Sequence, residues 1–568
     1  MTHDATPLSQ QYWYQTTSMD LRSLALFRVA LAIALGCTLA SLMGAVPLWF
    51  SDGGMMPRTD SLDLGGLAAH NLTLVTGDTA LLRLMLGVGL MASFTLMLGY
   101  RTRFSLGVAT LVLFSFVTRQ PLISLPHEVW LVGLALWSLS LPLGLRWSLD
   151  ATLGQTLAPG ASDTRRGGLI GLSWALQWLA LAGAALTIPV QDTAASLAIA
   201  GAIALLLALV SRGLLPTPSP WRWATPMLAL GGALGVLIAH RSSTALMTVA
   251  ALAVIPWLPS ALWTSLARRH ATGKPVQVFY DQDCRFCHQC CRVLQDLLIL
   301  PPGSSVKPAQ DNPRAHALMK AQNSWVVIDE QGRATLHWLA GVTLVRHSAW
   351  LAPLAPLLAL TPIRAAGDAC YQQVVRHRGL LAGLLGSLPP ASKPHNTMNG
   401  LALMALMLLV AQGIYVVTAP GPWFATPPGL AFTPFIAPPE ATRARARQQG
   451  QWVAAVERVP GQYRDALRGD QALTYNLTPV TGAYADTRWQ RYLAAAGAQL
   501  PGASIRRLAN RLCGAREDPP LAVNLEWIVA ADTRTQRGRI ERYRCVDGVA
   551  RSQRQRLDGD PVDLRPGE

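Results

Sequence analysis

The chain has 568 residues, of which 51% are apolar and only 14% are charged, whereas soluble domains carry roughly 25% charged residues. This balance disfavours a disordered protein, a coiled coil and an ordinary soluble enzyme. Mean hydropathy is only +0.27, so we expect long membrane stretches diluted by soluble parts. The 48 Lys+Arg against 32 Asp+Glu leave a net charge of +16, typical of a nucleic-acid binder or of the cytoplasmic loops of a membrane protein.

Apolar runs long enough to cross a bilayer, which takes about 20 residues, occupy the first half of the chain. We predict spans at 24–46, 79–99, 104–121, 127–145, 168–188, 193–211, 223–240 and 244–265, and a ninth at 398–418. Ten Arg and Lys residues follow the even-numbered spans and four lie in the alternate loops. This asymmetry predicts a cytoplasmic N-terminus and places the segment after span eight in the cytoplasm and the C-terminal region outside.

The segment between spans eight and nine has the pattern of a soluble α/β unit. A short β-type run at 276–280 precedes a helical pattern at 284–298, two runs at 324–330 and 334–338 predict a hairpin, and helices follow at 341–386. This order is typical of a thioredoxin-like fold. The predicted domains are an α-helical polytopic bundle at 1–270, the thioredoxin-like domain at 275–390, a ninth helix at 396–419, and a Pro-rich linker with an α+β domain at 420–568.

The C-terminal region contains two cysteines, Cys513 and Cys545, and a predicted strand pair at 523–529 and 539–545. Because the topology places this region in an oxidising compartment, we expect the two cysteines to form a structural disulfide. Two separate thiols are the alternative. The region carries an excess of Arg over acidic residues that suits anionic headgroups, and no basic stripe of the kind that binds nucleic acid is found in the sequence.

A Cys-x-x-Cys pair follows the strand at 276–280 and opens the next helix. Cys284 falls at the helix N-terminus, where free backbone N–H groups and the helix dipole favour a thiolate. Cys287 lies on the same face, three residues on. We therefore expect Cys284 to attack a disulfide and Cys287 to resolve the mixed disulfide. Asp281 and Asp283 oppose the thiolate if ionised, or one of them accepts a proton from the second thiol.

Two further thiols, Cys290 and Cys291, complete the cluster and are expected to be core or auxiliary thiols. Cys291 lies on the same helix face as the Cys-x-x-Cys pair and is a candidate auxiliary thiol that could exchange with it. Together with His288, the cysteines supply five soft ligands, so a metal site is a competing hypothesis, although a closed zinc site normally draws on two separated segments. Purely structural thiols are the third alternative, and the redox hypothesis requires no metal.

The residues Asp281, Cys284 and Cys287 resemble the Asp-x-x-Cys-x-x-Cys signature of the DCC family, whose members are regarded as thioredoxin-like thiol-disulfide oxidoreductases. The segments at 326–332 and 368–378 resemble the family's middle strand and its C-terminal helix with Tyr and basic residues. The resemblance covers roughly 275–385. It implies thiol-disulfide exchange with a protein or a small dithiol partner. The pair Cys290-Cys291 is a departure from the family motif.

The membrane part resembles the bacterial HTTM domain through its segments at 51–57, 99–103 and 137–150. That domain is distantly similar to the membrane part of vitamin K-dependent γ-carboxylases, but carboxylase chemistry is not transferred, because the catalytic positions cannot be matched. The resemblance implies a bacterial inner-membrane protein in contact with lipids, and a quinone-like or lipid ligand in the bundle. Arg28 is the ionisable residue expected deepest in a span, with a helix-to-helix partner and a functional site both open for it.

These observations together predict a multi-pass, membrane-bound thiol-disulfide oxidoreductase with a cytoplasmic DCC domain and an extracytoplasmic C-terminal domain. One alternative is a quinone- or lipid-linked membrane enzyme or carrier whose DCC domain supplies electrons. The other is a non-enzymatic metal-binding module.

Overall fold

The computed structural model describes the first apolar helices, the insert and much of the C-terminal region. The described residues are 19–64, 71–120, 123–139, 141–153, 164–165, 275–301, 303–349, 351–386, 450–468, 471–473, 502–514, 519–531 and 534–552, with short pieces within 252–263 and 488–493. Predicted spans five to eight (apart from those short pieces), the ninth span and the Pro-rich linker lie outside the described residues.

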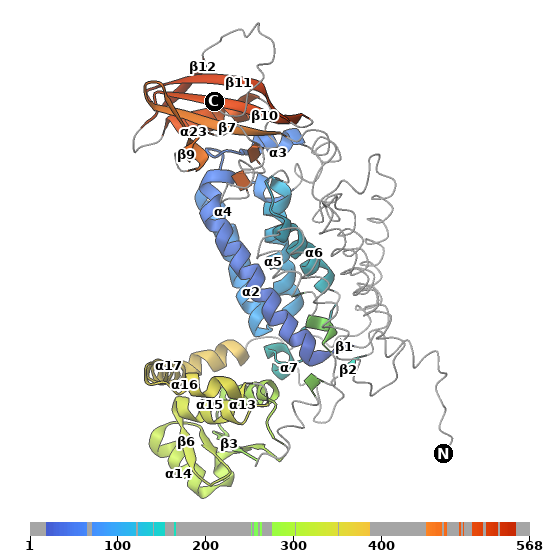
Figure 1. The fold of residues 1–568 in the computed structure, drawn as a ribbon. Helices are drawn as coiled ribbons and strands as arrows, with labels where there is room; N and C mark the ends of the chain where they lie inside the picture. Colours follow the sequence, from blue (N-terminus) through green and yellow to red (C-terminus); the bar gives the residue numbers. More distant parts are fainter. Residues whose placement is uncertain are drawn as a thin grey trace, which may run out of the picture.

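Four helices form the described part of the bundle (Figure 1). They are α2 (Leu21–Ala45, continued by the π-helical turn η1, Val46–Phe50), α4 (Thr79–Leu98), α5 (Thr102–Arg119) and α6 (Pro126–Ser138). Asp20 and Asp78 cap α2 and α4 by accepting hydrogen bonds from backbone N–H groups of the first turn. Among the described residues, the segments Leu21–Phe50 and Thr79–Leu98 are long and apolar enough to cross a membrane.

The fourth predicted span, 127–145, is wrong in its extent. Helix α6 ends at Ser138 and has 13 residues, about 20 Å at 1.5 Å per residue, which is shorter than a hydrocarbon core of about 30 Å. Pro142 lacks the N–H that a continuing helix needs, and the chain from 141 to 148 forms turns and bends. The short helix α7 (Leu149–Leu153) follows.

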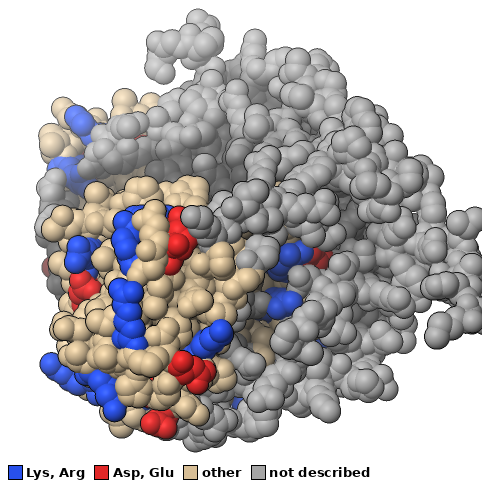
Figure 2. Space-filling model, turned by 90° about the horizontal axis from the view of Figure 1, so that it is seen from below, with Lys and Arg blue, Asp and Glu red and all other residues tan. Residues whose placement is uncertain are grey.

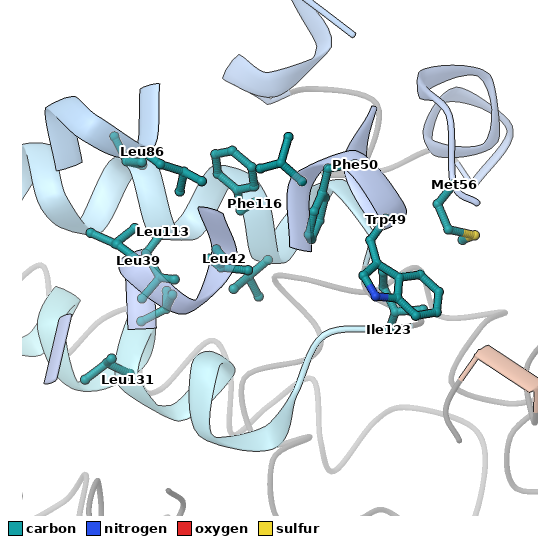
Figure 3. Close-up of a cluster of buried hydrophobic side chains, with 14 of the residues drawn as sticks. Leu39, Leu42, Trp49, Phe50, Met56, Leu86, Leu113, Phe116, Ile123 and Leu131 are labelled. Atoms are coloured by element: carbon teal, nitrogen blue, oxygen red, sulfur yellow. The ribbon is translucent and has the colours of Figure 1, made fainter. Parts of the chain in front are cut away.

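Large apolar side chains pack between α2, α4 and α5. Figure 3 shows Leu39 and Leu42 of α2 facing Leu113 of α5, and Phe50 beside Phe116, their ring centroids 5.3 Å apart. Trp49 points the other way, toward the loop that holds Met56 (Figure 3), and its ring lies 5.6 Å from that of Tyr492 in the C-terminal region. The bundle core is therefore continuous with the core of the C-terminal domain.

The insert folds around a four-stranded sheet in the order β4-β3-β5-β6. Its strands are β3 (Gln277–Tyr280), β4 (Ser305–Pro308), β5 (Val326–Ile328) and β6 (Ala334–Leu336). Strand β3 is parallel to β4 and antiparallel to β5, and β5 is antiparallel to β6. The helices are α13 (Arg285–Leu298), α14 (Pro313–Gln322), α15 (His337–Arg346), α16 (Ala355–Leu358) and α17 (Thr361–Gly386). The sequence pattern predicts neither β4 nor α14.

The C-terminal region forms an antiparallel six-stranded sheet in the order β12-β11-β10-β7-β8-β9. Its strands are β7 (Gly450–Val459), β8 (Gln462–Asp465), β9 (Gln471–Ala472), β10 (Ala522–Ala531), β11 (Arg534–Val546) and β12 (Val549–Ser552). The paired strands β10 and β11 contain the two runs predicted at 523–529 and 539–545. Helix α23 (Gly502–Cys513) contacts β10, β11 and β12.

The four-stranded and six-stranded sheets lie at opposite ends of the bundle (Figure 1), and a third sheet of two strands pairs β1 (Met19–Asp20) with β2 (Thr164–Arg165). At the C-terminal domain's end, two ion pairs join it to the bundle: Arg488 with Glu128, and Arg507 with Asp60 on the short helix α3 (Arg58–Leu64). The carboxylates of both pairs are buried. At the other end, α7 packs against α13 of the insert.

Arg28 has backbone carbonyls as partners in the described structure. Its guanidinium donates to the carbonyls of Leu143, Arg146 and Trp147 at 3.0, 3.1 and 2.5 Å. Gly99, in the left-handed conformation at the end of α4, leaves room for it, because a Cβ there would lie 2.8 Å from Arg28 Cζ. The segments at 99–103 and 137–150 therefore meet around Arg28, which supports a structural role for this residue.

Candidate thiol-disulfide site

The Cys-x-x-Cys pair lies where strand β3 passes into helix α13. Cys284 is the N-cap residue of α13, with extended backbone angles, and its Sγ accepts the N–H of Cys287 at 3.2 Å. Cys284 and Cys287 are joined by a disulfide, with their Cα atoms 5.2 Å apart. A sulfur in this position satisfies one of the free N–H groups of the first turn and lies at the positive end of the helix dipole, so the site favours a thiolate when the bond opens.

The loop before the pair is held by Asp281 and by Gln310, which follows β4. The Gln310 side chain donates to Asp281 Oδ1 at 3.1 Å and accepts the N–H of Gln282 at 3.2 Å. Asp281 Oδ1 also accepts the N–H of Asp283 at 3.3 Å, and the Asp281 carbonyl accepts the N–H of Cys284 at 3.0 Å. Asp281 therefore shapes the turn that presents Cys284, whereas the Asp283 side chain is exposed.

The two further thiols lie one turn along α13, away from solvent. Cys291 is buried in the apolar cluster under the sheet, and Cys290 is half-buried. Burial raises the pKa of Cys290 to about 11 and that of Cys291 to about 12. Both are therefore protonated at neutral pH and poor nucleophiles, which favours an auxiliary or structural role.

A cavity of about 590 Å³ opens beside the disulfide. Residues from the β3–α13 loop, α13, α14, the start of β5 and α17 line it. Cys287, Cys290 and Cys291 line it from α13, Asp281 and Asp283 from the loop, and Lys320 and Arg378 from α14 and α17. Its apolar lining consists of Leu294, Met319, Trp325, Val374 and Val375.

Helix α17 is fixed over the cavity by the segment that resembles the DCC family's C-terminal helix. Tyr371 Oη accepts the N–H of Trp325 at 3.2 Å and donates to Ser324 Oγ at 3.4 Å. Asp368 Oδ1 accepts the N–H of Trp338, at the start of α15, at 3.1 Å. Burial raises the pKa of Tyr371, so its hydroxyl keeps its proton at neutral pH.

The cysteines of the C-terminal domain are also joined. A disulfide links Cys513, at the end of α23, to Cys545 of β11, far along the chain from the site in the insert. Within the described residues, no three or more His, Cys, Asp and Glu side chains are grouped so that they could hold a metal ion. The ring of His288 instead stacks on Tyr280, with centroids 4.8 Å apart.

The cysteines and both aspartates of the site are predicted from the sequence, whereas Tyr371 and Arg378 lie in the segment 368–378, noted there only for its resemblance to the DCC family. Other residues of the site, Gln310 and Lys320 among them, are not predicted. Gln310 and Lys320 lie on the unpredicted strand–helix segment that contains β4 and α14. A signal was present in the Asn312-Pro313 step, since Asn is a favoured N-cap and Pro a favoured first helical residue, and Asn312 does cap α14.

Comparison of the chain with protein-family models, with curated proteins and with solved structures finds no match. The resemblance to the DCC and HTTM families therefore depends on the motif residues themselves.

Proposed function

We propose that the protein is a membrane-bound thiol-disulfide oxidoreductase whose insert is a thioredoxin-like DCC domain. The observation that carries the proposal is the Cys284–Cys287 disulfide at the N-terminus of α13, with Cys284 Sγ accepting the N–H of Cys287. The strand order β4-β3-β5-β6, with one parallel and two antiparallel pairs, supports the thioredoxin-like assignment.

In the reduced protein, the Cys284 thiolate attacks one sulfur of a substrate disulfide, and the other sulfur leaves as a thiolate. Cys287 loses its proton and attacks Cys284 Sγ in the mixed disulfide, which releases the second substrate thiol. Substrate disulfide and protein dithiol thus become substrate dithiol and protein disulfide, with two electrons transferred. Asp281 and Asp283, which line the same cavity as Cys287, are the carboxylates proposed to take the Cys287 proton.

Three features support the membrane assignment. Apolar side chains form an outward stripe along α4, and Leu84 and Met91 are each 64% exposed, as expected for a lipid-facing helix. Arg101 and Arg103 follow α4 at the end of the bundle that contacts the insert, in agreement with the positive-inside rule. The insert and the C-terminal domain lie at opposite ends of the helices (Figure 1), as a cytoplasmic and an extracytoplasmic domain require.

The charge distribution on the insert supports a partner other than nucleic acid. Figure 2 shows the described face of this domain that points away from the bundle, where Lys and Arg are interspersed with Asp and Glu. A surface of mixed charge lacks the continuous basic band that tracks a phosphate backbone. The proposed partners are a protein or small dithiol and the lipids around the bundle.

The proposal is tested with the purified full chain and its Cys284→Ser and Cys287→Ser variants. Wild type should exchange with dithiothreitol and with a model disulfide substrate, and Cys284→Ser should lose catalysed exchange. Cys287→Ser should accumulate the substrate as a mixed disulfide on Cys284, detected by peptide mass spectrometry. Cys370→Ser, which removes an exposed thiol of α17 outside the cavity, is the control. Undiminished exchange in Cys284→Ser would rule the mechanism out.

A further inference from the structure

The two sulfurs of the disulfide face different surroundings. Among the described residues that line the cavity beside the pair, Cys287 is present and Cys284 is not. Cys284 lies at the helix N-cap, where its sulfur accepts the Cys287 N–H. A molecule inside the cavity therefore meets Cys287, whereas a partner at the domain surface meets Cys284.

The size and lining of the cavity limit what can enter. A volume of about 590 Å³ lies in the range of small-molecule sites, roughly 300–1,000 Å³, and is too small for a folded partner. Lys320 and Arg378 reach the lining from α14 and α17, and neither forms an ion pair with the residues that the structure describes. Two acids also line the cavity from the β3–α13 loop: Asp281 is already bound to Gln310 and to the turn, and the Asp283 side chain is exposed to solvent, whereas the two cations lie on α14 and α17. The cations are thus available to an anionic ligand.

We propose that the cavity admits a low-molecular-weight thiol bearing a carboxylate, and that this thiol reduces the disulfide by attacking Cys287. The inference rests on the proposed function and adds the chemical class of the electron donor that reduces the Cys284–Cys287 disulfide after each turnover. Lys320 and Arg378 hold the carboxylate by charge-assisted hydrogen bonds, and Leu294, Met319 and Val374 contact the carbon chain.

The reaction balances without a further reductant. A thiolate of the donor attacks Cys287 Sγ, the Cys284–Cys287 bond breaks, and Cys284 leaves as a thiolate at the N-terminus of α13, which is the favoured position for a leaving thiolate. A second donor thiolate attacks the donor's own sulfur in the mixed disulfide and releases Cys287. Two donor thiols are oxidised to one disulfide, the protein pair gains two electrons, and the donors' two protons pass to Cys284 and Cys287.

The test uses the purified, prereduced Cys284→Ser full chain, in which Cys287 keeps any adduct because no second thiol of the pair resolves it. Three symmetrical disulfides serve as probes: 3,3′-dithiodipropionate (anionic), bis(2-hydroxyethyl) disulfide (neutral) and cystamine (cationic). Adducts on Cys287 are measured by peptide mass spectrometry, and each rate is divided by the rate of the same probe with a free thiol in solution. We expect the anionic probe to react up to about fivefold faster than the neutral one, as for an ion pair between exposed groups.

Variants locate the source of this preference. The double change Lys320→Ala and Arg378→Ala should abolish it, whereas Arg376→Ala, on the same helix but outside the cavity lining, should retain it. In Cys287→Ser, adducts on Cys284 should form without a charge preference. Equal normalised rates on Cys287, or the same anionic preference on Cys284, would overturn the inference while dithiothreitol exchange still supports the proposed function. Failure of both cysteines to react with every disulfide probe, together with failure of dithiothreitol to reduce the wild-type Cys284–Cys287 disulfide, would overturn both.

Discussion

The disulfide of the C-terminal domain makes a stability prediction whose size follows from its place in the chain. Cys513 and Cys545 are 32 positions apart, and closing a loop of that length removes chain entropy from the unfolded state worth about 3.7 kcal/mol. Replacing both cysteines with Ser should lower the free energy of unfolding of this domain by about that amount. With a urea m-value of about 2 kcal/mol/M, the midpoint should fall by about 2 M.

The assay is hydrogen exchange of β10 and β11 peptides in the full chain across a urea series. The matched control is the double change Cys284→Ser and Cys287→Ser, which removes the other disulfide and should leave this transition in place. The entropy argument is refuted if the midpoint moves by less than about 0.5 M. Acid quenching followed by alkylation of the denatured protein at neutral pH adds a test of compartment, because an extracytoplasmic domain should be isolated with Cys513 and Cys545 oxidised.

Three further outcomes are expected. Burial raises the pKa values of Cys290 and Cys291 to about 11 and about 12, so their thiolates form only as the pH rises toward those values. Alkylation followed by mass spectrometry at pH 7.5 should therefore show the exposed Cys370 reacting at least about 100-fold faster than Cys290 and Cys291. Gly99→Ala should destabilise the chain by about 2–4 kcal/mol in thermal unfolding, because φ is +71° and the new Cβ would lie 2.4 Å from a serine Cβ. Glu128→Gln removes a buried ion pair between the bundle and the C-terminal domain and should weaken the association of the two by about 3 kcal/mol. The C-terminal domain should then be proteolysed faster, and an unchanged rate would contradict this.

The sequence located the Cys-x-x-Cys helix well because its signals are local. The β-type run predicted at 276–280 is β3, and the helix predicted at 284–298 is α13 with Cys284 as its cap. A strand signal, a turn and an N-cap each depend on residues within a few positions of one another. The thiol-disulfide chemistry proposed for this segment therefore follows from its local sequence, without knowledge of tertiary contacts.

The segment from 305 to 322 was missed for the opposite reason. Strand β4 has four residues, Ser-Val-Lys-Pro, and no alternation of apolar and polar side chains. It is a strand because it pairs in parallel with β3, a partner 28 positions earlier. Because this segment was not predicted, Gln310 and Lys320 were not predicted as site residues either, although both line the cavity. Four of the seventeen residues that line the cavity lie in this segment, so part of the candidate site depends on a strand pairing that no local pattern reveals.

Arg28 shows why the sequence alone does not distinguish a helix-to-helix partner from a functional site for an arginine in a predicted span. If the partner of Arg28 were a charged side chain, the sequence would show an acidic residue within a neighbouring predicted span. Instead, the two terminal nitrogens of the guanidinium donate to three backbone carbonyls of the turns that follow α6, and the acid that interacts with it electrostatically, Asp150, lies after that helix and outside the predicted spans. Every residue has a carbonyl, so such acceptors leave no trace in composition or spacing. What makes them available is the early end of α6 near Pro142, because a helix broken there frees carbonyls that a continuous span would have used internally. The same break that shortens the predicted fourth span thus gives the buried arginine its partners.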